Sequence, residues 1–174
     1  MRSFLIYLIS TVFIFTSLKS QADQFTLGAD DIISVIVFNE IDLSHESVRI
    51  STTGDIPMPL IGQVEIAGLS IAEAESKIKF LYSQGFLKNP DISISVIEYR
   101  LFYIDGMVEN PGGYNYRKGM TVQRAITLAG GFTERADKEE ITIKNNGEKT
   151  VVADGNLDHS VSPGDVIVVK ERFF

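Results

Sequence analysis

The chain of 174 residues contains no cysteine and no tryptophan. Without cysteine it has no disulfides, no thiolate chemistry and no cysteine-ligated zinc, and we expect no lipid anchor on an N-terminal cysteine. Without tryptophan, a surface that stacks on sugar rings would have to use tyrosine or phenylalanine. Histidine is nearly absent too: only His45 and His159 occur, neither beside a nucleophile-elbow motif. We expect both histidines in solvated loops without a catalytic role.

Acidic residues outnumber basic ones. The sequence has 23 Asp and Glu against 16 Lys and Arg, which gives a formal net charge of −7. Nucleic acids and anionic lipids need clustered cations on the protein that binds them, so this balance argues against both as partners. It is compatible with a neutral polymer, and it favours solubility.

The first residues have the pattern of an export signal. Arg2 gives a positive start, residues 4–18 are uncharged and mostly apolar, and residues 20–22 (SQA) form a small-x-small cleavage site. The apolar run is shorter than the roughly 18 to 20 residues of a spanning helix. We therefore predict a signal peptide of residues 1–22, cleaved after Ala22; the alternative is a retained membrane anchor. Loss of this segment would change the formal charge from −7 to −9.

Residues 23–98 alternate between short strands and one helix. Strands are predicted at residues 32–38, 48–51, 62–67 and 92–96. Pro57 and Pro59 reduce residues 56–60 to an edge or irregular strand, because proline cannot donate to a ladder.

The clearest helix follows Ser70. Ser70 and Glu73 have the spacing of a capping box, and Gly85 with the Asn89-Pro90 pair ends the segment. Between them, apolar residues recur at helical spacing, at Ile71, Ala74, Ile78 and Leu81.

Residues 99–174 form a second unit with its own turns. A strand over residues 102–108 leads into the turn at residues 110–113 (NPGG), where the glycines are expected to supply positive φ. A helix over residues 121–129 ends at a Gly-Gly pair, and an Asn-Gly hairpin joins strands at residues 140–144 and 149–153. A final turn, Pro-Gly-Asp, begins the strand at residues 166–169. This order is typical of a small β-grasp module, which usually binds ligands rather than cleaving them. The whole chain is therefore predicted to be α+β, with a boundary near residues 98–100.

No pattern for catalysis, a cofactor or a metal stands out. Asp30 and Asp31 are adjacent and would point to opposite faces of a strand, so we expect capping or turn hydrogen bonds from them. Residues 154–158 (DGNLD) lack the acidic spacing and the closing glutamate of a calcium loop. The glycine pairs lie at a hairpin and at a helix end rather than in a phosphate-binding loop. We expect no enzyme activity, no cofactor and no metal.

Aromatic residues concentrate near the boundary between the two units, at Tyr99, Phe102, Tyr103, Tyr114 and Tyr116. One interpretation is packing on a sheet, where aromatic residues are favoured. The other is a surface that contacts sugar rings, for which Tyr103, Tyr114 and Tyr116 are the candidates. Tyr114 and Tyr116 would lie on one side of a short strand.

Taken together, these motifs resemble the periplasmic polysaccharide-export proteins of Gram-negative bacteria. The first part of the resemblance covers residues 27–35 (LGADDIISV), 56–62 (IPMPLIG), 68–70 (GLS) and 89–92 (NPDI). Its family-motif residues are Gly28, Asp31, Pro59 and Gly62. This part implies a polysaccharide-export domain over residues 23–98.

The second part resembles the soluble-ligand-binding β-grasp (SLBB) domain of such proteins, which has a ubiquitin-like fold. The matching segments are residues 106–114 (GMVENPGGY), 129–132 (AGGF) and 163–169 (PGDVIVV). Their family-motif residues are Pro111, Gly112, Gly130, Gly131, Pro163, Gly164 and Asp165. The resemblance implies one SLBB domain over residues 99–174.

Some features of longer family members are not matched. Those proteins carry a lipidated cysteine, further β-grasp copies and a C-terminal amphipathic helix that crosses the outer membrane, and we expect a short form without them. The resemblance then implies a homo-oligomeric ring in the periplasm, peripheral to the outer membrane. Its implied partners are polysaccharide, a separate outer-membrane barrel and an inner-membrane polysaccharide co-polymerase.

The resemblance implies a component of a capsule or exopolysaccharide exporter that forms or gates a conduit. The alternative is a periplasmic adaptor that binds a ligand or glycan without forming a conduit. A ring-sized particle would favour the exporter, and a monomer with ligand affinity would favour the adaptor. A hydrolase or lyase would need paired carboxylates, or a His or Tyr base, in a cleft.

Overall fold

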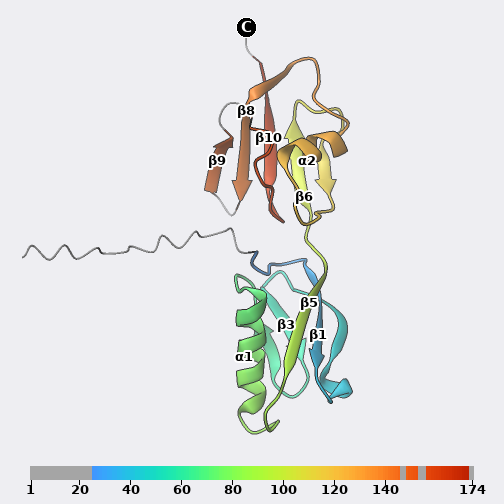
Figure 1. Ribbon diagram of the computed structural model, residues 1–174, viewed down its shortest axis with the longest axis vertical. Coiled ribbons are helices and arrows are strands. Elements are labelled where there is room, and N and C mark those ends of the chain that lie inside the picture. The colour runs from blue at the N-terminus through green and yellow to red at the C-terminus, as the bar shows by residue number, and fades with distance from the viewer. Residues whose placement is uncertain (1–24, 146–147, 153–155, 173–174) are drawn as a thin grey trace, which may run out of the picture.

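The computed structural model describes residues 25–145, 148–152 and 156–172, which form two modules placed end to end (Figure 1). The predicted signal peptide of residues 1–22, the Asn146-Gly147 pair of the predicted hairpin and part of the segment 154–158 lie outside the described residues. Helices and strands occur in both modules, which confirms the α+β class. Within the described ranges, no helix is long and apolar enough to cross a membrane.

The first module is built on a three-stranded antiparallel sheet with the order β2-β1-β5. A separate ribbon of β3 and β4 completes its strands, so Pro57 lies in an edge strand as predicted. In chain order the elements are β1 (Ile32–Val37), η1 (Ile41–Leu43), β2 (His45–Arg49), β3 (Asp55–Met58), β4 (Gly62–Glu65), α1 (Ile71–Ser83) and β5 (Ile92–Glu98).

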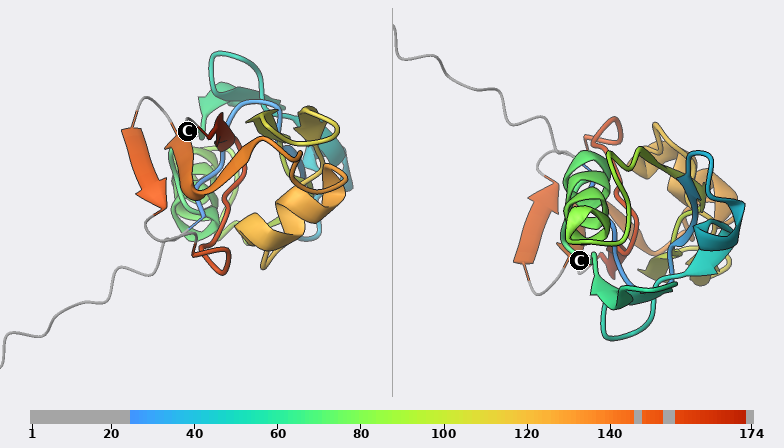
Figure 2. Two further views of the ribbon diagram at one scale, coloured as in Figure 1. Left: turned by 90° about the horizontal axis from the view of Figure 1, so that it is seen from above. Right: turned by 90° about the horizontal axis from the view of Figure 1, so that it is seen from below.

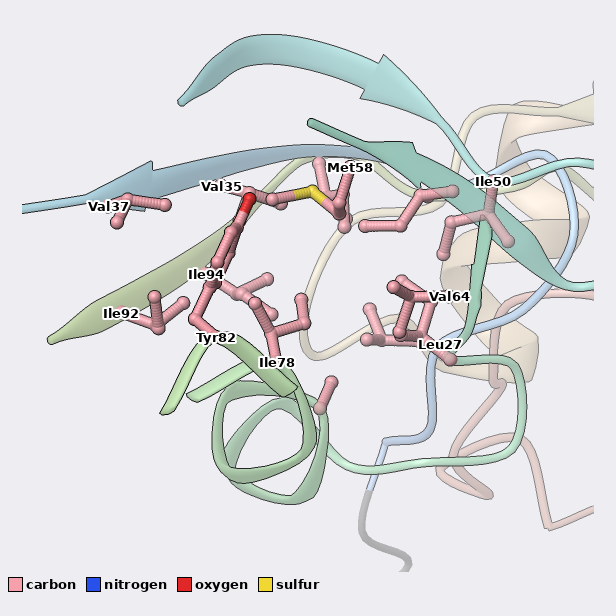
Figure 3. Packing of buried hydrophobic residues seen from close by; sticks show 14 of the residues in the cluster. Leu27, Val35, Val37, Ile50, Met58, Val64, Ile78, Tyr82, Ile92 and Ile94 are labelled. Carbon is pink, nitrogen blue, oxygen red and sulfur yellow. The ribbon is translucent and has the colours of Figure 1, made fainter. Parts of the chain in front are cut away.

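The core of the first module lies between α1, the sheet and the ribbon (Figure 3). From α1, the buried side chains are Ala74, Ile78 and Tyr82, whereas the predicted Leu81 is only half-buried. Tyr82 is fully buried, and its hydroxyl donates a hydrogen bond to the carbonyl of Pro59 at 3.0 Å. Burial raises the pKa of this phenol. Tyr82, which the periodicity did not single out, therefore ties the turn between β3 and β4 to the end of α1.

His45 lies in β2 opposite Val35, not in the solvated loop that we expected. Its side chain is half-buried, and its Nε2 atom is enclosed by protein. The strand begins earlier than predicted because β2 pairs along β1 through an irregular register, which brings His45 into the ladder. His159 is half-buried in the second module.

The second module is a five-stranded sheet with the order β7-β6-β10-β8-β9. The central strands β6 and β10 are parallel and the other pairs are antiparallel, which is the topology of a β-grasp fold. Its elements are β6 (Phe102–Gly106), β7 (Gly112–Tyr114), α2 (Val122–Leu128), β8 (Ala136–Asn145), β9 (Glu148–Val152) and β10 (Val166–Glu171). Seen from above, α2 lies to one side of the strands (Figure 2), and its buried residues join those of the sheet in one core.

The glycine that the first turn of this module requires is Gly106 rather than Gly112. The predicted strand over residues 102–108 ends at Gly106, which has a φ of +90°, and a Cβ there would overlap the carbonyl oxygen of Val169. Gly112 has a φ of 158°, close to extended, and begins β7. Close approach of β10 to β6 therefore sets the end of β6.

The capping box of α1 makes a pH-dependent prediction. The Glu73 carboxylate accepts hydrogen bonds from the Ser70 hydroxyl at 2.7 Å and the Ser70 backbone N–H at 2.8 Å, which lower the pKa of Glu73 below the ordinary value of a glutamate. Stabilisation from a lowered pKa is complete above the unfolded-state pKa and is lost as the pH falls through the folded-state pKa. The Tm of the wild type should therefore exceed that of Glu73→Gln at neutral pH, and the gap should shrink as the pH falls towards about 3.

Thermal melts at both pH values test this expectation. Glu46→Gln, which changes an exposed carboxylate on β2, serves as the control for a general loss of negative charge. A gap for Glu73→Gln that stays constant across the pH range would contradict the assignment.

Candidate functional site

Arg100 lies in the short link between the two modules (Figure 1). Its backbone N–H and its guanidinium Nη1 donate to the two oxygens of the Asp31 carboxylate at 2.7 and 2.8 Å. The backbone N–H of Gly28 also donates to Asp31, at 2.8 Å. The Asp31 side chain is fully buried, whereas 21% of the Arg100 side chain is exposed. A buried ion pair thus connects the start of the first module to the start of the second.

Each module approaches Arg100 with a glycine. A Cβ on Gly28 would lie 2.5 Å from Nη1 of Arg100, and a Cβ on Gly164 would lie 3.0 Å from its Nε. Gly164 also has a φ of +87°, and its N–H donates to the carbonyl of Leu101 at 3.0 Å. Two motifs that are far apart in the sequence, residues 27–35 and 163–169, therefore meet at a residue to which the sequence analysis gave no role.

Asp165 orders the turn on the second module's side. Its carboxylate accepts hydrogen bonds from the Ser162 N–H at 2.7 Å and from the Asn145 side-chain amide at 2.5 Å. Its backbone carbonyl accepts one from the Tyr103 N–H at 2.8 Å. Pro163, in the same turn, is buried. This turn therefore aligns the start of β10 with β6, beside Arg100.

Aromatic rings close the same junction. The rings of Phe25 and Tyr99 meet edge to face at 5.0 Å, and those of Tyr99 and Tyr116 at 5.2 Å. The Arg100 guanidinium lies 6.0 Å from the centre of the Phe25 ring. Burial raises the pKa of Tyr116, and a hydrogen bond with the backbone of Gly119 opposes that shift. Tyr116 lies beyond the end of β7, not on one strand face with Tyr114 as expected, because β7 ends at Tyr114.

The remaining motif residues of the second module form a second cluster at the C-terminal end of α2. Gly130 has a φ of +86°, and a Cβ there would lie 2.7 Å from the Asn110 side chain. The N–H of Asn110 donates to Ala129 at 2.8 Å. Gly131, with a φ of +100°, accepts from the Glu109 N–H at 3.1 Å. The loop that contains Pro111 and Gly112 is therefore docked on the end of α2. Gly62, with a φ of +74°, begins β4 in the other module.

A surface cavity of about 620 Å³ lies between α2 and the loop that follows β7. Among the residues that line it, Met120 is buried and Tyr114 is half-buried. The hydroxyl of Tyr114 donates to the carbonyl of Asn110 at 2.5 Å. The other residues that line the cavity are Asn115, Arg117, Lys118, Gln123, Arg124, Thr127 and Leu128. We call this cavity the α2 pocket.

The three tyrosines that are candidates for contact with sugar do not lie together in one site. Tyr114 lines the α2 pocket, and Tyr116 packs at the junction between the modules. Tyr103 is 48% exposed and lies beside Gly113, where a Cβ would meet its ring at 3.0 Å. Of the three, Tyr114 is the one that lines the α2 pocket, and contact with sugar remains one of its two interpretations.

The arrangement fits binding or structural support. In the described part of the chain, no group of three or more His, Asp or Glu side chains is placed to hold a metal ion. His45 and His159 lie in separate modules. The basic α2 pocket and the Arg100 junction were both missed by the sequence analysis. A possible signal was the run from residue 110 to 133, which contains three basic residues and no acidic one.

The fold defines a two-module α+β protein in which a three-stranded sheet domain precedes a β-grasp domain. Family models match residues in each of these parts: "Polysaccharide biosynthesis/export protein" over residues 19–97 and "SLBB domain" over residues 101–153. The chain therefore belongs to the polysaccharide export family.

Curated relatives are similar over much of this chain. The exopolysaccharide production protein ExoF of Rhizobium meliloti is 29% identical over 130 residues, which cover 68% of this chain and 30% of ExoF. The EPS I polysaccharide export outer membrane protein EpsA of Ralstonia nicotianae is 26% identical over 192 residues, which cover 89% of this chain and 49% of EpsA. The EPS I polysaccharide export outer membrane protein EpsA of Ralstonia solanacearum is 25% identical over 178 residues, which cover 87% of this chain and 47% of that EpsA. The chain thus spans half or less of the length of these relatives.

Loss of Arg100 should destabilise the protein far more than loss of an exposed arginine. Arg100→Leu leaves the Asp31 carboxylate buried without its partner, which costs about 3 kcal/mol. The control, Arg49→Leu, breaks a 3.9 Å pair with Asp30 in which both side chains are more than half exposed, and it should cost less than about 1 kcal/mol. Urea denaturation measures both free energies of unfolding. Similar small losses for the two variants would show that the junction does not depend on this pair.

Proposed function

We propose that this chain is a non-enzymatic component of an exporter for capsule or exopolysaccharide, and that it acts in the periplasm beside the outer membrane. The observation that carries the proposal is the pair of matched domains in the order of the family, export domain first and SLBB domain second. The names of the relatives, which refer to exopolysaccharide production and to polysaccharide export, support it.

In this proposal the chain forms a homo-oligomeric ring that lines or gates a hydrated passage. A closed ring needs heterologous contacts with a fixed angle between them, so the two modules must not swing freely. The buried Asp31–Arg100 pair and the two glycines packed against it support such a fixed unit. The ends of both sheets supply strand edges for contacts between subunits, at β2 and β5 and at β7 and β9.

Exposed apolar side chains support a contact with other protein at the far end of the first module. The end of β1 pairs with the start of β5, and the Phe38 N–H donates to Asp91 there, away from Arg100. Large exposed apolar residues lie near this end. Phe38 and Ile41 follow β1, Leu60 follows β3, and Phe86 follows α1. Such clusters mark interaction surfaces more often than isolated exposed residues do. The proposed partners are further copies of the chain, an outer-membrane barrel and an inner-membrane polysaccharide co-polymerase.

The α2 pocket favours a second candidate, a periplasmic adaptor that binds a ligand or glycan without forming a conduit. The two candidates differ in assembly. Light scattering of the purified protein at concentrations up to those of the periplasm separates them: large closed particles support the conduit, and a monomer that binds a glycan supports the adaptor.

Deletion of the gene should block export. Surface polysaccharide should fall and polymer should accumulate inside the cell, and an intact copy of the gene should restore the surface polymer. Polymer is measured separately in surface, periplasmic and cytoplasmic fractions. Normal surface polymer in a strain without a second copy of the gene would overturn the exporter and favour the adaptor.

A further inference from the structure

The α2 pocket has a charge opposite to that of the chain as a whole. The chain carries 23 acidic and 16 basic residues, yet three of the nine residues that line the pocket are Arg117, Lys118 and Arg124, and none is Asp or Glu. The segment from residue 110 to 133 contains no acidic residue at all. The acidic average of the sequence therefore does not describe this site.

The basic side of the pocket is held in shape by hydrogen bonds. The guanidinium of Arg124, on α2, donates to the carbonyl of Gly119, in the loop before this helix, at 2.8 Å. The N–H of Met120 donates to the carbonyl of Arg117 at 3.0 Å, and Gly119 has a φ of +80° that suits this turn. The side chains of Arg117 and Lys118 are exposed. The loop thus presents two solvent-accessible cations beside a third that is tied to the backbone.

The chemistry of these side chains selects the ligand. Arginine and lysine only donate hydrogen bonds, and they bind most strongly to carboxylate, phosphate or sulfate groups. The pocket's own uncharged polar groups suit sugar hydroxyls. The side-chain amides of Asn115 and Gln123 can both donate and accept, whereas the Thr127 hydroxyl donates to the Gln123 carbonyl at 2.8 Å and can still accept. Apolar surface for the C–H face of a sugar ring comes from Tyr114, Met120 and Leu128.

We propose that the α2 pocket binds an acidic sugar unit, one that carries a carboxylate or another anionic substituent, and that the polymer handled by this protein is therefore an acidic polysaccharide. The choice of a saccharide as the ligand rests on the proposed function, whereas its charge is argued from the pocket alone. Exposure of the cations to solvent keeps each contact weak, as the passage of a polymer requires.

Calorimetric titration at low salt tests the proposal with probes matched in size. The probes are tetragalacturonate and its fully methyl-esterified form, which differ in charge and not in length. The variant is Arg117→Gln with Lys118→Gln, which leaves the Arg124–Gly119 contact in place. The control is Lys79→Gln with Lys88→Gln, which removes the same charge from exposed positions on the other module. Melting curves check that both double variants are folded.

Wild type and the control should bind tetragalacturonate about tenfold more tightly than the ester, and the pocket variant should lose about tenfold in affinity for the acid. Equal binding of the ester would overturn the proposal, as would an equal loss in the control variant. Binding to phosphatidylserine vesicles without binding to tetragalacturonate would assign the pocket to an anionic lipid instead.

The titration tests the acidic ligand and the deletion strain tests the exporter role, and either claim can fail without the other. If deletion blocks export but the acid and its ester bind alike, the proposed function stands and the acidic ligand is wrong. If export is normal but acid binding depends on Arg117 and Lys118, the pocket stands as an anionic-saccharide site and the exporter is wrong.

Discussion

The structure depends on a buried carboxylate whose hydrogen-bond donors come from the first module and from the link to the second. Asp31 is fully buried, and a charged group in that position is costly unless donors surround it. Its donors are the N–H of Gly28 in its own module and the backbone and guanidinium of Arg100 in the link. The buried Asp31 of the first module therefore has all of its donors only when Arg100, at the start of the second, is correctly placed. The glycine at position 164 lets the second module close over the same guanidinium.

This connection gives a physical reason for two motifs of the family. Gly28 and Gly164 both lie where a Cβ would press on Arg100, and Asp165 keeps its turn aligned with β6. The contacts of Gly28 and Gly164 with Arg100 lie where the two modules meet, so their loss would loosen the angle between the modules. In the proposed ring, an error in that angle would be repeated at each subunit and would prevent closure. The motifs are therefore better explained by the geometry of the unit than by contact with polysaccharide.

The distribution of charge along the chain describes the α2 pocket better than the net charge of the whole chain does. A net charge of −7 is compatible with a neutral polymer, and it hides a stretch of 24 residues, from 110 to 133, without any acid. The fold gathers the three cations of that stretch around one cavity by placing the loop after β7 against α2. Exposed cations on a hydrogen-bonded loop would suit the proposed reversible contact with an acidic polymer, whereas a deep and dry site would bind it tightly.

Features that depend on neighbouring residues could be predicted from the sequence: the capping box at Ser70 and Glu73, the edge strand at Pro57 and the order of elements in the β-grasp module. Their signals are local, since caps, turns and ladder donors are set within a few residues. Tertiary structure alone decided the pairing of Arg100 with Asp31, 69 residues apart, the burial of Tyr82 and the separation of the three tyrosines. The burial of Tyr82 depends on packing within the first module, and the Arg100–Asp31 pair and the placement of Tyr116 depend on how the two modules meet. These arrangements bring together groups that no spacing in the sequence relates.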